Sequence, residues 1–314
     1  ATGLDSCREP HLDLMEYFDK FVRAYPDDSK FGFIWMSYLT HDNPNMIFHA
    51  DGDVVKFFQR NQEEFDESFV FFMGDHGLRF GKQRESKLGR VEVNNPMLHM
   101  IVPKVIREKF AERLAINSKE FITMFDLHST FVDIVEYQSM SNFAGHDYIS
   151  IPSPVQGSSL LRRLNPALPR NCRTLPVPFD YCPCAFDVQA VENKSTRKAM
   201  AAFVADLMNK ELKQLQLDAA CSKLDVDGEP DVTAFAPVNE THLYRVEFVA
   251  TPGGGRFESL VRTSRPEDPS SYTLASPYFN RLNAYGKAAE CITRAPQKPF
   301  CYCKKFLADK KHKG

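Results

Sequence analysis

An apolar run ends directly in an acid and an imidazole that stand between two glycines. The run is FVFFM (69–73), and GDHG (74–77) follows it without a spacer. Glycines release the backbone past a strand end, so both side chains can turn toward one ion. A carboxylate oxygen beside a neutral imidazole nitrogen is the start of a zinc or manganese site. The alternative from spacing alone is a turn in which Asp75 caps the next segment and His76 is half exposed.

Basic residues follow this motif closely, at Arg79, Lys82 and Arg84. Guanidinium groups bind the oxygens of phosphate and sulfate in pairs, so these residues are candidate anion contacts. Charges on a solvated loop are an equally good interpretation. A further histidine, His99, lies inside the apolar run PMLHMIVP (96–103), where we expect a core histidine with satisfied hydrogen bonds.

The elements that would position the motif alternate between helix and strand. Apolar residues at helical spacing predict helices over 10–24 and about 53–67. Continuous apolar runs predict strands over 31–39, 69–73 and 96–103. Runs that are apolar on both faces are typical of parallel sheets covered by helices, and a strand, a helix and a strand in succession form a βαβ unit. The sequence therefore predicts an α/β fold with a mixed or parallel sheet flanked by helices.

Candidate ligands follow two of these predicted strands. His41 comes just after the first strand, and Asp75 and His76 come after the second. In open α/β sheets, ligands bind beyond the carboxyl ends of the strands. We therefore expect these three side chains at one edge of the sheet.

The second half of the chain has a different pattern. Residues 121–137 begin extended and become helical, and residues 145–183, rich in Pro, Ser and Arg, are expected to be irregular. Apolar residues on one side predict a long helix over about 191–216. Alternation around Pro-Gly-Gly-Gly predicts an antiparallel hairpin over 244–263.

Cysteine usage indicates an oxidising compartment. An even number of cysteines in a loop-rich region favours disulfides, and hence the extracellular space or the lumen of the secretory pathway. Zinc held by the CPC and CYC pairs is the alternative, although structural zinc sites space paired cysteines by about two to four residues. Sequons for glycosylation at Asn193 and Asn239 point to the same compartment. The disulfide candidates are Cys7, Cys172, Cys182, Cys184, Cys221, Cys291, Cys301 and Cys303.

Charge and hydropathy exclude some partners. The net charge is −2, with 39 basic and 41 acidic residues, so no broad field favours nucleic acid or an anionic membrane. No stretch reaches the roughly 18–20 apolar residues that cross a bilayer, so we expect no membrane span in this chain. Any recognition of a charged group must therefore be local.

Longer stretches resemble a known superfamily. FFMGDHGLRFG, GRVEVNNPMLHMIVP and FDLHSTFVDI are similar to the C-terminal half of the catalytic domain of sulfatases and alkaline phosphatases. The chain also resembles one branch, the animal secreted sulfatase-like proteins with a domain of unknown function. The stretches that carry this closer resemblance are THDNPN, DHGLRFG, SLLRRLNPALPRNCRTLPVPFDYCPC, PVNE, NRLNAYGKAAECITR and FCYCKK. The resemblance implies an alkaline-phosphatase-like sheet over residues 1–155. Residues 156–314 would then form a Cys-rich α+β extension, with the long helix and the hairpin, packed on the first domain.

The resemblance also implies roles for single residues. Asp75 and His76 match the metal-binding pair of the superfamily, so a divalent metal, either zinc, manganese or calcium, is expected. His41 is similar to a histidine that approaches the tetrahedral anion or a metal, and a local hydrogen bond is the alternative. His128 stands near a helix start, where a structural role is expected before a role as third ligand. The implied reaction is metal-dependent hydrolysis or transfer of a phosphate or sulfate ester.

The group that would attack such an ester is not identifiable. In the superfamily, this nucleophile is a Thr, Ser or formylglycine in the N-terminal half. It lies well before the strand that carries the histidine to which His41 is similar. Only 40 residues precede His41, and Cys7 is followed by Arg-Glu-Pro, not by the sulfatase pattern Cys-x-Pro-x-Arg. We therefore expect an incomplete part of a larger enzyme, inactive alone and lacking the N-terminal half of its domain. The alternative is a catalytically dead, disulfide-stabilised extracellular binding or scaffold domain.

Overall fold

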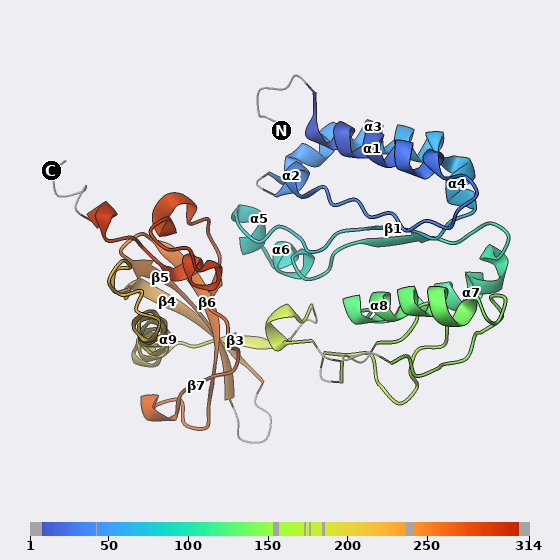
Figure 1. Cartoon of the computed structure of the whole chain (residues 1–314). Helices are drawn as coiled ribbons and strands as arrows, with labels where there is room; N and C mark the ends of the chain where they lie inside the picture. The colour runs from blue at the N-terminus through green and yellow to red at the C-terminus, as the bar shows by residue number, and fades with distance from the viewer. Residues whose placement is uncertain are drawn as a thin grey trace. The chain divides into compact units, whose positions relative to one another are not determined.

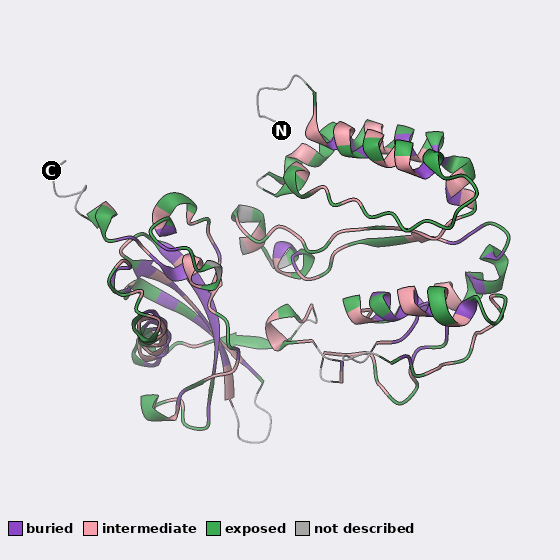
Figure 2. Ribbon diagram, viewed as in Figure 1, coloured by how far each residue is buried: buried purple, intermediate pink, exposed green. Residues whose placement is uncertain are grey.

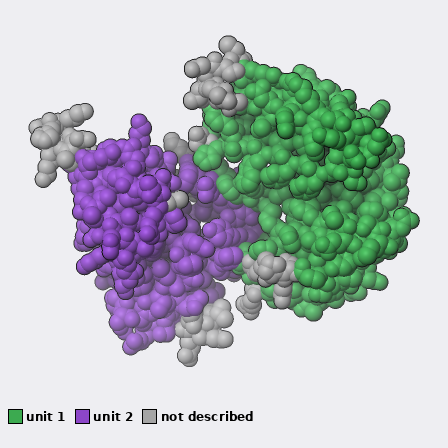
Figure 3. Space-filling model, viewed as in Figure 1, with its two compact units in different colours: residues 1–78, 96–177 green, residues 79–95, 178–314 purple. Residues whose placement is uncertain are grey.

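The chain divides into two compact units, which Figure 3 shows in different colours. Unit 1 comprises residues 1–78 and 96–177, and unit 2 comprises residues 79–95 and 178–314. The boundary predicted near residue 155 stays a prediction. The computed structural model describes residues 8–41, 43–152, 157–172, 174–175, 177–183, 186–236 and 242–307.

Helices and one small sheet make up unit 1 (Figure 1). The predicted helix over 10–24 is confirmed as α1, and α3 packs against it. Met15, Phe57 and Phe65 form the buried core of this region. The elements of unit 1 are α1 (Pro10–Ala24), α2 (Ser37–Thr40), η1 (Pro44–Met46), α3 (Ile47–Arg60), α4 (Gln62–Asp66), β1 (Val70–Met73), β2 (Leu98–Ile101), α7 (Arg107–Asn117), α8 (Met124–Val132) and η2 (Asp133–Gln138).

The predicted α/β class is confirmed in its coarse form, as helices with antiparallel sheets, whereas the parallel sheet stays a prediction. β1 and β2 pair in antiparallel register, with Val70 opposite Ile101. No parallel pair of strands is found in the parts of unit 1 that the structure describes. The chain reverses direction between these two strands, so that they pair as antiparallel neighbours. The alkaline-phosphatase-like arrangement stays a prediction.

The prediction of a strand over residues 31–39 is wrong. Residues 31–36 have no regular secondary structure, and α2 begins at Ser37. The side chains of Phe31, Phe33 and Trp35 are 80%, 71% and 62% exposed. A strand needs a neighbour that pairs with its backbone N–H and C=O groups, and no described strand pairs with this segment. Its strong β-propensity is therefore not realised.

Two buried ion pairs tie the irregular segment 157–172 to the helices of unit 1. Arg170 Nη2 lies 2.5 Å from Asp126 Oδ2, and Arg162 Nε lies 2.9 Å from Asp133 Oδ1. Both aspartates are completely buried. Asp126 also forms a capping box with Thr123 at the start of α8, which satisfies backbone donors of the first turn.

Unit 2 is a twisted antiparallel sheet with a long helix on one face (Figure 1). The predicted long helix and hairpin are both confirmed, as α9 and as the pair β5 and β6. The strand order is β3-β4-β5-β6-β7, and β8 also pairs with β6. The elements are α5 (Lys82–Glu85), α6 (Lys87–Glu92), η3 (Phe179–Tyr181), β3 (Val188–Ala190), α9 (Lys194–Gln214), β4 (Asp225–Phe235), β5 (His242–Thr251), β6 (Gly255–Thr263), η4 (Pro269–Ser271), β7 (Thr273–Leu274), β8 (Asn280–Arg281), η5 (Gly286–Ala289) and η6 (Ala295–Phe300).

The core of unit 2 lies between α9 and the sheet. Met200, Val204 and Met208 on the helix and Val246 on β5 have no exposed surface. Figure 2 shows this burial as purple stretches along the strands. Alternate residues of a strand point to opposite faces, so the odd-numbered residues of β5 lie on the second face of the sheet. Among the residues described, no helix has both the length and the apolar character that crossing a membrane requires.

Candidate functional site

The predicted metal ligands lie in the loop that follows β1. β1 ends at Met73, and Asp75 and His76 have no regular secondary structure. Their side chains are 56% and 45% exposed, respectively. Both are therefore open to solvent and to ligands.

Local hydrogen bonds set the orientation of the His76 ring. Its Nδ1 lies 2.8 Å from the carbonyl oxygen of Gly77. A carbonyl can only accept, so Nδ1 carries the proton and Nε2 of a neutral ring carries the lone pair. The same arrangement, a ring N–H bound to a backbone carbonyl, holds metal-binding histidines in place. The backbone N–H of His76 also donates to Asp75 Oδ1 at 2.9 Å, which fixes the carboxylate.

The remaining atoms of the pair suit a cation. His76 Nε2 lies 3.5 Å from Asp75 Oδ2. Two lone-pair-bearing atoms that face each other are stabilised when a cation lies between them. Tetrahedral ligands at about 2.1 Å from zinc are about 3.4 Å apart, which is close to the observed distance. The chemistry of the donors therefore suits zinc or manganese, and their spacing fits two ligands of a tetrahedral zinc ion.

The described residues do not place a third metal ligand beside Asp75 and His76. Among them, the one group of three or more potential ligand atoms lying close together is that of Cys221, Cys291 and Cys301, which are in disulfides. His41 is exposed and caps the C-terminal end of α2. His128 is exposed on α8. The structure does not bring these two histidines together with Asp75 and His76.

His99 differs from its prediction. It lies on β2 opposite Phe72, and both side chains are exposed. The predicted core position is therefore wrong. The strand is apolar in sequence, but the exposure of His99 and Phe72 shows that the described residues leave this part of the sheet face open to solvent.

The candidate anion contacts belong to unit 2. Arg79 is exposed, and its guanidinium carbon lies 5.7 Å from the centre of the Phe80 ring. Arg84 is largely buried, with Nη2 3.8 Å from Glu258 Oε1. The side chain of Lys82 lies outside the described residues. An anion-contact role for these residues stays a prediction, and here the guanidinium of Arg84 faces a carboxylate.

Arg84 is part of an arginine–glutamate cluster on the second face of the unit 2 sheet. Glu247 on β5 and Glu258 on β6 stand directly opposite each other. Arg90 Nη1 lies 2.6 Å from Glu247 Oε1 and 3.3 Å from Glu258 Oε2. Two like charges on opposite strands repel each other, and the arginines offset this repulsion. These contacts tie residues 79–95 to the sheet.

Two more arginines of the sheet complete the cluster. Arg245 Nε lies 3.6 Å from Glu258 Oε2, and Arg256 Nη2 lies 3.9 Å from Glu247 Oε2. Sequence reasoning missed this cluster. The available signal was the repetition of Arg and Glu two residues apart on both strands of the predicted hairpin, which places all four side chains on one face.

The pH dependence of stability should reveal the burial of Glu258. Burial raises the pKa of Glu258 and Glu247 adds to this effect, while the arginines act against it. Because the pKa of Glu258 is raised in the folded state, protonation of this carboxyl group stabilises the fold at pH values below its usual pKa of 4.5. The contribution is lost as the pH rises through the folded value. Relative to Glu258→Gln, the wild type should therefore gain unfolding free energy as the pH falls from 7 to 4, measured by urea unfolding.

Glu290→Gln provides a control, because its difference from the wild type in unfolding free energy should change with pH in the opposite direction. A hydrogen bond from Lys305 lowers the pKa of Glu290. The wild type should lose unfolding free energy relative to this variant as the pH falls. A Glu258→Gln difference that is independent of pH would contradict the assigned burial effect.

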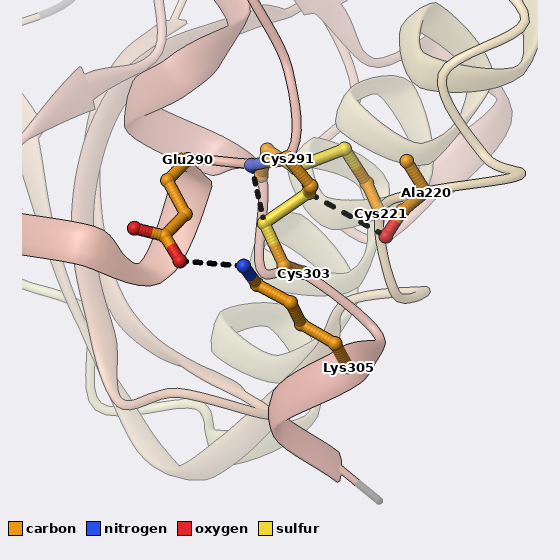
Figure 4. Close-up of a disulfide and its surroundings, with 7 residues drawn as sticks. Ala220, Cys221, Glu290, Cys291, Cys303 and Lys305 are labelled. Atoms are coloured by element: carbon orange, nitrogen blue, oxygen red, sulfur yellow. Dashed lines mark hydrogen bonds and ion pairs between the residues drawn. A yellow bond between two sulfur atoms is a disulfide. The ribbon is translucent and has the colours of Figure 1, made fainter.

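Four cysteines of unit 2 form two disulfides, and Figure 4 shows the surroundings of one of them. Cys221 is bonded to Cys301, and Cys291 is bonded to Cys303. Cys172 and Cys182 are also disulfide-bonded. The predicted use of cysteines in disulfides is confirmed for these residues, and the CYC pair is not a zinc-binding thiolate pair. Cys7 and Cys184 lie outside the described residues.

Asn193 is exposed and caps the N-terminal end of α9. Its Oδ1 accepts hydrogen bonds from the backbone N–H groups of Ser195 and Thr196. The Nδ2 atom, to which a glycan would attach, takes no part in this cap. Glycosylation of Asn193 stays a prediction, and Asn239 lies outside the described residues.

Comparison with known proteins identifies a family. Residues 3–228 match the model of the family described as "Protein of unknown function (DUF229)", which is sulfatase-like. The chain belongs to this family, as the sulfatase-like resemblance of its motifs implies. The comparisons with curated proteins and with solved structures found no match.

Proposed function

We propose that this chain supplies two metal ligands, Asp75 and His76, to a hydrolase or transferase of phosphate or sulfate esters. Membership of a sulfatase-like family supports the reaction class. The observation that carries the proposal is the orientation of His76. Its Nδ1 is bound to Gly77, which leaves Nε2 facing Asp75 Oδ2 at 3.5 Å.

The donor set favours some metals over others. An imidazole nitrogen with a carboxylate oxygen suits zinc and manganese, whereas calcium prefers oxygen ligands alone. When bound, such an ion would stabilise negative charge on the attacked group and on the leaving oxygen. Asp75 and His76 would hold the ion, and the exposure of both side chains leaves room for further ligands and for the substrate.

Metal binding by the chain tests the proposal. Isothermal titration with zinc and manganese at pH 7.5 should show binding that Asp75→Asn and His76→Gln each weaken by at least about 100-fold. His49→Gln is the matched control, because exposed His49 also lies beside a carboxylate, 3.1 Å from Glu9 Oε1. An equal affinity in all four proteins would contradict the proposed ligands.

The reaction class needs its own experiment. The protein encoded by the complete transcript should hydrolyse an aryl phosphate or an aryl sulfate in the presence of the metal that binds this chain. Asp75→Asn should abolish that activity, and His49→Gln should retain it. Metal binding without hydrolysis of either ester would favour the alternative function, a binding or scaffold domain without catalysis.

We also propose that the protein works outside the cell or in the lumen of the secretory pathway. The disulfides at Cys221–Cys301 and Cys291–Cys303 support this location, because the cytosol keeps thiols reduced. Thiol titration of the denatured protein from culture medium should detect almost no thiol at these four positions. Recovery of the protein only as a reduced cytosolic form would contradict the location.

A further inference from the structure

Among the described residues, the contacts that hold Arg281 on β8 in place come from neutral groups. Its Nε donates to the carbonyl oxygen and to Oδ1 of Asn283, at 3.0 Å and 2.6 Å. Its Nη1 donates to the carbonyl oxygen of Pro299 at 2.8 Å. The guanidinium carbon lies 5.0 Å from the centre of the Phe257 ring. The position of the charged group is therefore well defined.

No carboxylate of the described residues balances the charge of Arg281. No acidic side chain lies within 4.0 Å of its guanidinium in the described ranges of the chain. Burial lowers the pKa of Arg281 to about 10. Its Nη2 makes no hydrogen bond with any of the residues that the structure describes. A partly desolvated cation with a free donor is a favourable place for an anion.

A small pocket lies beside this guanidinium. It has a volume of about 10 Å³, enough for one water-sized sphere, and Pro252, Gly253, Tyr302 and Arg281 contribute to its lining. The backbone N–H of Gly253 has no acceptor among the described residues. A side chain at Gly255 would place its Cβ 2.6 Å from Arg281 Nη1, so this glycine is needed for the close approach.

We propose that this pocket binds one small inorganic anion of about the size of chloride, with Arg281 Nη2 as the principal donor. A monatomic anion needs less space beside Arg281 than sulfate or phosphate, which have four oxygens around the central atom. The anion would neutralise Arg281 where the β5–β6 turn approaches the disulfide of Cys301. Bound chloride would thereby stabilise unit 2.

Thermal unfolding of the full chain in different salts tests the site. At constant ionic strength, exchange of gluconate for chloride or bromide should raise the melting temperature by about 2–4 °C in a saturable manner. Sulfate stabilises proteins because it is excluded from their surfaces, so its effect on the melting temperature should not saturate and should persist in Arg281→Met. Equal melting temperatures in chloride and gluconate, or a response to sulfate alone, would overturn the proposal.

Variants and crystals locate the site. Arg281→Met should lose the response to chloride, while Arg262→Met, at an exposed position on β6, should retain it. A retained response in Arg281→Met would overturn the assignment. If Arg281→Met does not fold, crystals of the wild-type protein test the location of the site. Crystals soaked in bromide should show an anomalous peak within about 3.5 Å of Arg281 Nη2, and a peak absent there overturns the proposal.

Discussion

Replacing Arg162 by methionine is expected to lower the free energy of unfolding by about 3–5 kcal/mol. Asp133 is completely buried, and the Nε of Arg162 lies 2.9 Å and 3.0 Å from its two carboxylate oxygens. The remaining partner of the carboxylate is Gln138 Nε2, at 3.2 Å from Oδ2. Removal of the guanidinium would therefore leave a buried carboxylate with no opposite charge among the residues that the structure describes. Denaturant unfolding followed by circular dichroism measures this loss.

An exposed pair of the same type provides the control for Arg162. Arg107 Nη2 lies 3.3 Å from Asp66 Oδ1, and both side chains are partly exposed. Arg107→Met should cost less than about 1 kcal/mol, because solvent screens this pair. The double variant Arg162→Met and Asp133→Asn should be more stable than Arg162→Met, because it no longer buries an unpaired charge. If Arg162→Met and Arg107→Met lose the same unfolding free energy, burial of the ion pair does not explain the effect of Arg162.

Removal of the Cys221–Cys301 disulfide should have the second large effect. The two residues are 80 positions apart. Loop-closure entropy for a loop of this length gives a loss of about 4.5 kcal/mol on substitution of both cysteines by serine. The bond joins the segment between α9 and β4 to the C-terminal segment, and both cysteines are buried in the core of unit 2. Guanidinium unfolding under non-reducing conditions measures the change.

The second disulfide serves as a comparison within the same unit. Cys291 and Cys303 are 12 positions apart, so substitution of this pair by serine should cost about 3 kcal/mol. The shorter loop loses less entropy when it is closed. A larger loss for Cys291 and Cys303 than for Cys221 and Cys301 would contradict the entropic explanation.

Local patterns predicted much of the secondary structure. The helical spacing of residues 10–24 and the long apolar helix face after residue 191 gave α1 and α9. The Pro-Gly-Gly-Gly turn identified the hairpin of β5 and β6. In each case one segment, or two segments joined by a short turn, contains the interactions that stabilise it. Such elements can be recognised without knowledge of the rest of the chain.

Pairing between distant segments could not be predicted in the same way. The apolar run at 31–39 has strong β-propensity, but a strand requires a partner, and none of the described strands pairs with it. β1 and β2 were both predicted as strands, but their antiparallel direction depends on the path of residues 74–97 between them. Direction and register are tertiary properties, because they depend on which segments meet.

The candidate site shows the same division. The residue types at Asp75 and His76, and the family of the chain, follow from the sequence alone. Only the three-dimensional structure showed that Nε2 of His76 faces its neighbour Asp75, and only tertiary packing placed Arg84 beside Glu258. It also placed Arg281 beside a small pocket with no carboxylate of the described residues next to it. Local composition specifies which groups are present, whereas their charges and burial depend on the neighbours that folding brings to them.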